Sequence, residues 1–246
     1  MKTILFTLLF GLAFHFTLSG QQFNYLPDSI PGHQIIVYEQ FTLSYNEQYE
    51  QADWVAYELT KKEVKQHQPR SNYFCKDANV ISESASRKDY RFTGFDLGHL
   101  SPAADNNLSP VANKQSFLMS NISPQLPGFN RGIWKKLEKW VRQKAKKYDT
   151  VYVITGPVFI GILGSIGDDS VAIPAYFYKV LLRKQGNHYY SIGFLIPQIG
   201  ARGKLSDYVV PVNAVETLTG IDFFPALPDN KENKTEAQFQ VGKWGL

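Results

Sequence analysis

The residues best suited to chemistry surround His99, which lies in the segment Thr93-Gly-Phe-Asp-Leu-Gly-His-Leu-Ser-Pro-Ala-Ala-Asp105. A histidine that titrates near neutral pH can take a proton from water and so make the water a nucleophile. Gly98, directly before it, would let a bulky substrate approach the backbone. Because an isolated histidine in a turn is more often structural, the neighbouring segments must decide between a catalytic and a structural interpretation.

A second pair of segments supplies candidates for metal binding, Ser120-Asn-Ile-Ser-Pro-Gln125 and Phe129-Asn-Arg-Gly-Ile-Trp-Lys-Lys-Leu-Glu138. Asn130 opens a predicted helix, on which Glu138 and Arg142 flank the apolar stripe at the edge of the core. The amide oxygen of an asparagine is a hard ligand that suits Mg²⁺, which keeps most of its waters. In the alternative interpretation Asn130 is a helix N-cap and Glu138 and Arg142 form a surface pair.

Positive charge is concentrated in the same helix. Residues 135–147 carry seven lysines and arginines against the single acid Glu138. A solvated helix face explains most such runs, but beside a catalytic site the same face would attract phosphate groups.

The hydrophobic periodicity predicts one α+β domain. A helix is expected over residues 131–147, and residues 61–90 are expected to form a long surface loop. Strands are expected at 35–38, 41–45, 54–59, 151–154, 175–182, 190–196 and 209–212, followed by a short helix at 213–219.

Composition narrows the class of protein further. The chain has 246 residues, of which 43% are hydrophobic, and a formal charge of +4, which permits a polyanionic partner. Its one cysteine, Cys75, excludes an internal disulfide and a cysteine zinc site. Residues 1–20 combine Lys2 with an apolar run and predict a cleaved signal peptide, hence a secreted or periplasmic protein without stable membrane association. Residues 21–40 are expected to be a lead-in, 41–228 the domain, and 229–246 a polar tail.

These segments together resemble the DNA/RNA non-specific endonuclease family of the ββα-metal nucleases, which includes mitochondrial endonuclease G. The resemblance rests on Asp96-Leu-Gly-His99, on Pro102-Ala-Ala-Asp105, on Ser120–Gln125 and on Asn130–Glu138. It extends to Trp54–Leu59, Tyr152–Pro157 and Ile173–Val180. The resemblance implies a central, mainly antiparallel sheet flanked by helices, with a ββα-metal unit made of the strand ending near His99, a second strand at Leu118–Ser120, and the Asn130 helix.

The resemblance also implies a role for each candidate residue. His99 resembles the general base, Asn130 the one direct protein ligand of a hydrated Mg²⁺ (with Mn²⁺ as a substitute), and Glu138 an acceptor for a metal-bound water. The remaining candidates are Asn121, which would orient the site; Arg70 and Arg142, which would hold phosphate or the acidic network; Asp96 and Gly98, which would shape the loop; and Arg91, Arg131 and Lys135, which would contact substrate.

One residue departs from the family pattern. The arginine expected before Gly98-His99 is Leu97, which cannot donate to a phosphate. Because His99, Asn130 and Glu138 are all present, we nevertheless predict an active enzyme, weakened unless a nearby cation substitutes for the missing arginine. It is expected to be a Mg²⁺-dependent endonuclease that cuts DNA and RNA, leaves 5′-phosphate and 3′-hydroxyl ends, and forms a homodimer. The alternative, supported by Leu97 alone, is a weak or silent nucleic-acid- or partner-binding protein on the same fold.

Overall fold

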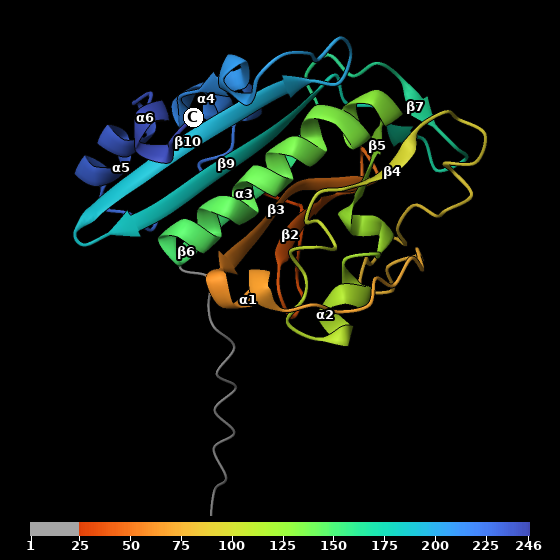
Figure 1. Cartoon of the computed structure of the whole chain (residues 1–246). Helices are drawn as coiled ribbons and strands as arrows, with labels where there is room; N and C mark the ends of the chain where they lie inside the picture. Colours follow the sequence, from red (N-terminus) through yellow and green to blue (C-terminus); the bar gives the residue numbers. More distant parts are fainter. Residues whose placement is uncertain (1–24) are drawn as a thin grey trace, which may run out of the picture.

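The computed structural model describes residues 25–246 (Figure 1). The predicted signal peptide at residues 1–20 lies outside the described residues. Among the described helices, none is both long and apolar enough to cross a bilayer.

A seven-stranded antiparallel sheet forms the centre of the molecule. Its spatial order is β1 (Gln34–Val37), β2 (Thr42–Asn46), β3 (Gln51–Thr60), β6 (Thr150–Val158), β9 (Tyr176–Gln185), β10 (His188–Pro197) and β11 (Val209–Val210). Side chains alternate between the two faces with period two, so that Phe177 and Leu181 face one side while Tyr178 and Val180 face the other. The expected strands are all present, although the 209–212 strand keeps only its first two residues.

Helices cover both faces of the sheet, as α+β patterning predicts. The long helix α3 (Lys135–Tyr148) lies across one face and buries Leu137, Trp140 and Val141. The opposite face is covered by α4 (Val212–Thr219) together with Phe223 and Phe224. The central, mainly antiparallel sheet flanked by helices is therefore confirmed.

A small two-stranded ribbon lies beyond the N-terminal end of α3 (Figure 1). Its strands are β4 (Asp96–His99) and β5 (Ile122–Gln125), and His99 is paired with Ile122. The second strand was expected at Leu118–Ser120, and this prediction is wrong. That stretch leads into the 3₁₀ turn η1 (Met119–Asn121), because the Asn121 amide donates to the Leu118 carbonyl at 2.9 Å.

The remaining elements are short. They are α1 (Lys61–Lys65), α2 (Pro110–Gln115), η2 (Phe129–Trp134), β7 (Ser165–Ile166), β8 (Val171–Ala172), η3 (Leu205–Tyr208), α5 (Asp229–Glu236) and α6 (Val241–Trp244). The loop expected over 61–90 is irregular after α1.

Both ends of the described chain pack onto the sheet. Residues 21–40, expected to be a lead-in, contain the edge strand β1. Residues 229–246, expected to be a polar tail, contain two helices, and Trp244 is fully buried against Trp140. Its indole nitrogen donates to the Ser191 carbonyl at 3.1 Å, so one tryptophan anchors a segment whose composition is otherwise polar.

Candidate active site

His99 ends β4, and its ring contacts two phenylalanines that also contact each other. The ring centre lies 4.8 Å from that of Phe117 and 5.4 Å from that of Phe74. The buried Nε2 atom has no hydrogen-bond partner among the described residues. Burial, together with the smaller effect of the positive charge of Arg70, lowers the pKa of His99 to about 3. The imidazole is therefore neutral at physiological pH and has a nitrogen free to accept a proton.

Arg70 approaches this histidine from the long loop after α1. Its guanidinium lies 5.1 Å from the centre of the Phe117 ring, on the phenylalanine that also contacts His99. Its Nε donates to the Asn72 side chain at 2.7 Å, and its side chain is otherwise exposed. The structure thus places an exposed cation beside the candidate base, although the two residues are 29 positions apart.

Asp96 connects the His99 strand to the candidate metal ligand. Its carboxylate accepts from Asn130 Nδ2 at 2.9 Å and from Arg131 at 2.8 Å (Nε) and 2.5 Å (Nη2). Because the amide nitrogen of Asn130 is bound to Asp96, its oxygen Oδ1 is left as the donor atom for a cation. Asp96 therefore braces both the loop and the helix start, while Arg131 remains 72% exposed.

The helix does not begin as the sequence pattern predicts. Residues Phe129–Trp134 form one wide π-helical turn, inside which Gly132 leaves helical geometry at φ −98° and ψ −109°. The helix expected over residues 131–147 is therefore regular only from Lys135 onward. A glycine without Cβ allows this break, and π-turns are frequent at functional sites.

Glu138, on α3, lies in a cluster of charges. Its pKa is raised to about 7, because burial and the charge of Asp105, which raise it, outweigh Lys179, Arg142 and Arg70, which lower it. Arg142 does not hydrogen bond to Glu138 as the surface-pair alternative requires. It donates instead to Asp105 at 2.7 Å, and Asp105 also accepts from the Tyr57 hydroxyl at 2.9 Å.

Sequence reasoning gave no catalytic role to Asp105 or Lys179. Asp105 was visible as the last residue of the Pro-Ala-Ala-Asp turn. Lys179 is a single cation within the apolar strand Tyr176–Leu182, and that interruption is the signal that could have found it.

Asn121 and Gly98 position the site from inside the protein. The Asn121 side chain is fully buried. Its Nδ2 donates to the carbonyls of Ser101 and Ser116, and its Oδ1 accepts from the Ser101 amide, all at 2.8–2.9 Å, which fixes the loop after His99. The role expected for Asn121, to orient the site, stays a prediction that these contacts support. A Cβ on Gly98 would lie 2.3 Å from the Gln125 side chain, so the space expected to admit substrate is filled by the protein itself.

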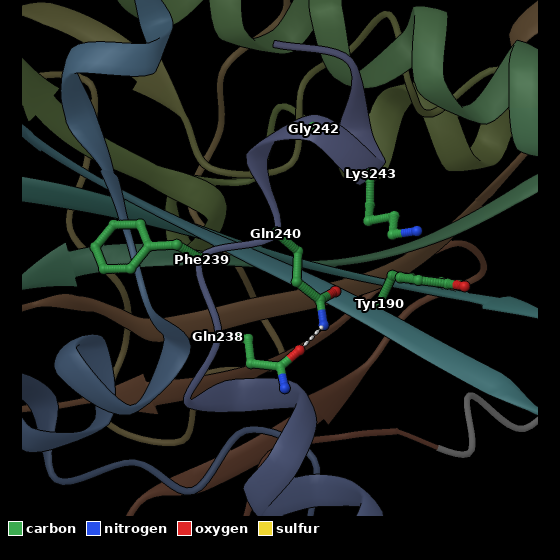
Figure 2. Close-up of a pocket in the computed structure, with 6 residues that line it drawn as sticks. All are labelled: Tyr190, Gln238, Phe239, Gln240, Gly242 and Lys243. Atoms are coloured by element: carbon green, nitrogen blue, oxygen red, sulfur yellow. Dashed lines mark hydrogen bonds between the residues drawn. The ribbon is translucent and has the colours of Figure 1, made fainter.

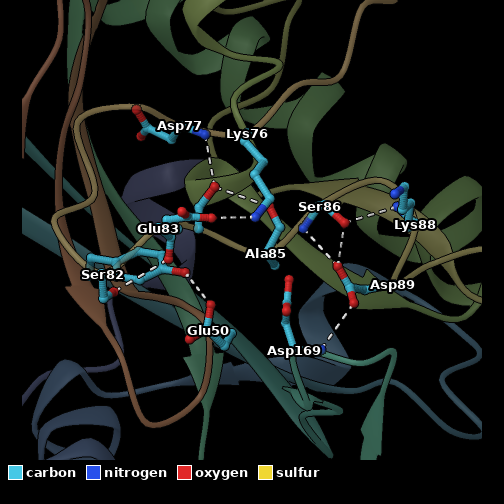
Figure 3. A network of polar contacts seen from close by, with 12 residues as sticks. Glu50, Lys76, Asp77, Ser82, Glu83, Ala85, Ser86, Lys88, Asp89 and Asp169 are labelled. Atoms are coloured by element: carbon cyan, nitrogen blue, oxygen red, sulfur yellow. Dashed lines mark hydrogen bonds and ion pairs between the residues drawn. The ribbon is translucent and has the colours of Figure 1, made fainter.

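Leu97 is half-buried and packs against the small cluster that contains Tyr90, Met119 and Ile122. The loop before it is tied down by polar contacts (Figure 3). The Asp89 carboxylate accepts from the Ser86 amide at 2.8 Å and from the Asp169 amide at 3.1 Å. The expected substrate contacts Arg91 and Lys135 are exposed to solvent.

The exposed lysines of α3 form a basic strip, defined as Lys135, Lys136, Lys139, Lys146 and Lys147. Lys144 is not part of it, because its side chain is buried with Nζ 4.8 Å above the Trp140 ring.

A cavity of about 490 Å³ lies elsewhere, at the C-terminal segment (Figure 2). It is lined by Tyr190 and by residues 238–243, and Gln240 donates to Gln238 there at 3.0 Å. None of the predicted site residues lines it.

The side chains that could bind a metal suit a hydrated hard cation better than one surrounded by several protein ligands. Within residues 25–246, no group of three or more His, Cys, Asp or Glu side chains is placed to hold a metal. One amide oxygen from the half-buried Asn130 fits an ion that keeps most of its waters, as Mg²⁺ does.

Comparison with known proteins defines the class. The model of the DNA/RNA non-specific endonuclease family matches residues 19–230, and the chain belongs to this family. It is an enzyme that hydrolyses phosphodiester bonds.

Individual relatives agree with this assignment. Nuclease C1 of Cunninghamella echinulata var. echinulata is 36% identical over 77% of this chain and 82% of its own. The mitochondrial endonuclease G of Caenorhabditis elegans is 34% identical over 77% of this chain and 68% of its own. A crystal structure of an EndoG/EndoGI complex, described as showing the mechanism of EndoG inhibition, superimposes with a TM-score of 0.73 at 28% identity, covering 80% of this chain and 88% of that one.

The expectation of a secreted or periplasmic protein is contradicted by this comparison. Besides the C. elegans enzyme, the curated relatives include further mitochondrial nucleases. An apolar N-terminal run is a weak guide to destination, because targeting signals are addresses read by receptors.

Proposed function

We propose that the chain is a Mg²⁺-dependent endonuclease that acts on DNA and RNA at the site formed by His99, Asn130 and Glu138. The observation that carries this proposal is the combination of a neutral His99 with an unpaired Nε2 and an Asn130 amide fixed by Asp96, three residues before that histidine. A hydrolytic nuclease needs a base and an oxygen atom that binds the metal. Here the base lies on the short strand β4, and the metal-binding oxygen belongs to Asn130, which Asp96 of the same strand holds in place.

Each residue has a distinct task in this proposal. His99 Nε2 takes a proton from the attacking water, which is worth about 10²- to 10⁴-fold in rate. Asn130 Oδ1 would hold the metal, and Glu138 would accept a hydrogen bond from a metal-bound water. When bound, the metal stabilises charge on the phosphate and the leaving 3′ oxygen. Arg70 stabilises negative charge on the phosphate beside the base.

Substrate contacts are proposed for the basic strip and for Arg91 and Arg131. These side chains are exposed, so they can approach the phosphates of either nucleic acid without reading a sequence. Cleavage is proposed to leave 5′-phosphate and 3′-hydroxyl ends. Mn²⁺ as a substitute and a homodimer stay predictions, testable by metal replacement and by sedimentation equilibrium.

The test uses supercoiled plasmid and total RNA with Mg²⁺ or with EDTA. Wild type should degrade both substrates in Mg²⁺ only, whereas His99→Ala and Asn130→Ala should be inactive but folded by circular dichroism. His188→Ala, which removes an exposed histidine, is the matched control and should retain activity. Nicks with the proposed ends should be sealed by a DNA ligase without prior kinase treatment. Cleavage that persists in His99→Ala would refute the assignment of the base.

A second candidate, a weak or silent binding protein, is favoured by Leu97 alone. It predicts salt-sensitive DNA binding without turnover in either Mg²⁺ or Mn²⁺. The same assay, combined with a gel-shift measurement, separates the two.

A further inference from the structure

Lys179 is a buried cation for which the reaction described above has no task. Its side chain is 0% exposed, and it lies on β9 between Phe177 and Leu181, in the core beneath α3. Its Nζ has no hydrogen-bond partner in the described part of the chain and lies 4.8 Å from the centre of the Trp134 ring. An ammonium removed from water is costly unless negative charge nearby offsets the cost.

Glu138 is the carboxylate in a position to provide that offset. It follows by four residues Trp134, which directly precedes α3 in helical geometry (φ −62°, ψ −48°). The two side chains therefore lie on the same side of the helix, the side on which Lys179 contacts the Trp134 ring. The charges that act on Lys179 come from α3 and from the loop after β4: Glu138, Arg142 and Asp105. Asp105 is already hydrogen bonded to Arg142 at 2.7 Å. Glu138 is the carboxylate that remains for Lys179.

We propose that Lys179 is a positioning residue whose ammonium is the internal counterion of Glu138 and favours the ionised form of that carboxylate at the active site. The inference rests on the proposed role of Glu138 in catalysis. Lys179 itself does not touch substrate; it acts from below the site, through Glu138.

The balance of charges around Glu138 supports this. Burial raises the pKa of Glu138 by more than the nearby cations lower it, so that the pKa lies at about 7; Lys179 is the strongest of those cations, ahead of Arg142 and Arg70. Asp105 acts in the opposite direction. Without Lys179, burial would be opposed only by the two arginines, of which Arg142 is engaged by Asp105 and Arg70 is exposed. The carboxylate would then be protonated at neutral pH and would accept hydrogen bonds less well.

The test replaces Lys179 with methionine, which keeps the chain length over Trp134 and removes the charge, and with arginine, which keeps the charge. Loss of a nearby opposite charge should raise the pKa of Glu138 by roughly one to three units. The acidic limb of the kcat/KM–pH profile should move to higher pH by the same amount in Lys179→Met and lie at the wild-type pH in Lys179→Arg. Lys144→Met is the matched control, because Lys144 is also buried at 4.8 Å from a tryptophan ring but is not among the charges that shift the pKa of Glu138. Its pH profile should not move.

A second readout does not depend on activity. Carboxyl ¹³C NMR of the metal-free protein follows the titration of Glu138, whose resonance is identified by its loss in Glu138→Gln. Its midpoint should rise in Lys179→Met and stay near the wild-type value in Lys144→Met. This readout also distinguishes the two proposals, since the coupling of Lys179 to Glu138 is measured even if the nuclease assignment fails.

The reciprocal measurement covers the case in which Lys179→Met does not fold. In Glu138→Gln the titration midpoint of Lys179, followed by its ¹³Cε resonance, should fall, because coupling between two sites acts equally in both directions. An unchanged Lys179 midpoint in Glu138→Gln would overturn the proposal. So would a Lys179→Met protein whose rate falls at every pH without movement of the acidic limb, since that result describes a packing role only.

Discussion

Replacing Asp105 with asparagine tests whether the buried network beneath the site is built as described. The Asp105 side chain is 1% exposed and accepts from Arg142 Nη1 at 2.7 Å and from the Tyr57 hydroxyl at 2.9 Å. Asparagine keeps the shape and can still accept from one of them, but it removes the charge opposite Arg142. Breaking a fully buried ion pair costs about 3–5 kcal/mol. Because the Arg142 side chain remains 21% exposed, we expect about 2–3 kcal/mol.

Thermal unfolding followed by circular dichroism measures this directly. For a chain of this length 1 kcal/mol corresponds to about 2–4 °C, so Tm should fall by roughly 5–10 °C. Asp149→Asn is the control: Asp149 is 77% exposed, pairs with Lys61 at 3.2 Å, and adopts a positive φ that asparagine tolerates. It should cost no more than about 0.5 kcal/mol. A loss below about 1 kcal/mol in Asp105→Asn, or a coupling energy near zero with Arg142→Met, would refute the network.

Three further predictions follow from the same geometry. Leu97→Arg should raise kcat by placing a bidentate donor at the phosphate; an unchanged or lower rate would mean that a neighbouring cation already compensates. Because the pKa of His99 is lowered to about 3, its base form is fully populated from pH 5 to 8, and any acidic limb in kcat/KM within that window should disappear in Glu138→Gln. Phe92 is fully exposed with φ +60°, so Phe92→Gly should stabilise the fold by about 1 kcal/mol in urea unfolding; a destabilised variant would show that the ring makes unrecognised contacts.

The sheet and the long helix were predictable because their signals are local. β-Branched and aromatic runs such as Val151–Ile154 and Tyr190–Ile196 alternate between faces, and the stripe Ile133, Leu137, Trp140 and Val141 repeats at helical spacing. The polar C-terminal segment was harder, since its attachment depends on one residue. Trp244 is buried by contacts with Trp140 and Ser191. No periodicity in residues 229–246 predicts these contacts.

The candidate site was predictable as a set of residues but not as a set of contacts. The ordered motifs around His99 and Asn130 selected both residues, yet the pairing of Arg142 with Asp105 rather than Glu138 could not be read from helical spacing. Helical spacing favours the pair Glu138–Arg142 only through local geometry. Arg142 pairs instead with the buried carboxylate of Asp105, which comes from a loop 37 residues earlier in the chain. The same holds for Gly98, whose missing Cβ makes room for Gln125 on the paired strand.

These differences share one physical cause. Within the buried interface between the sheet and α3, each ionised side chain needs a partner of opposite charge, and the partners come from whichever elements the fold brings together. Asp105 satisfies Arg142, and that pairing leaves Glu138 to Lys179 on a strand 41 residues further along the chain. A motif search identifies the residue that faces the substrate, since spacing along one element constrains it. The opposing charge that favours the ionised form of this residue is set by the tertiary fold, so it becomes visible only when the strands are placed beneath the helix.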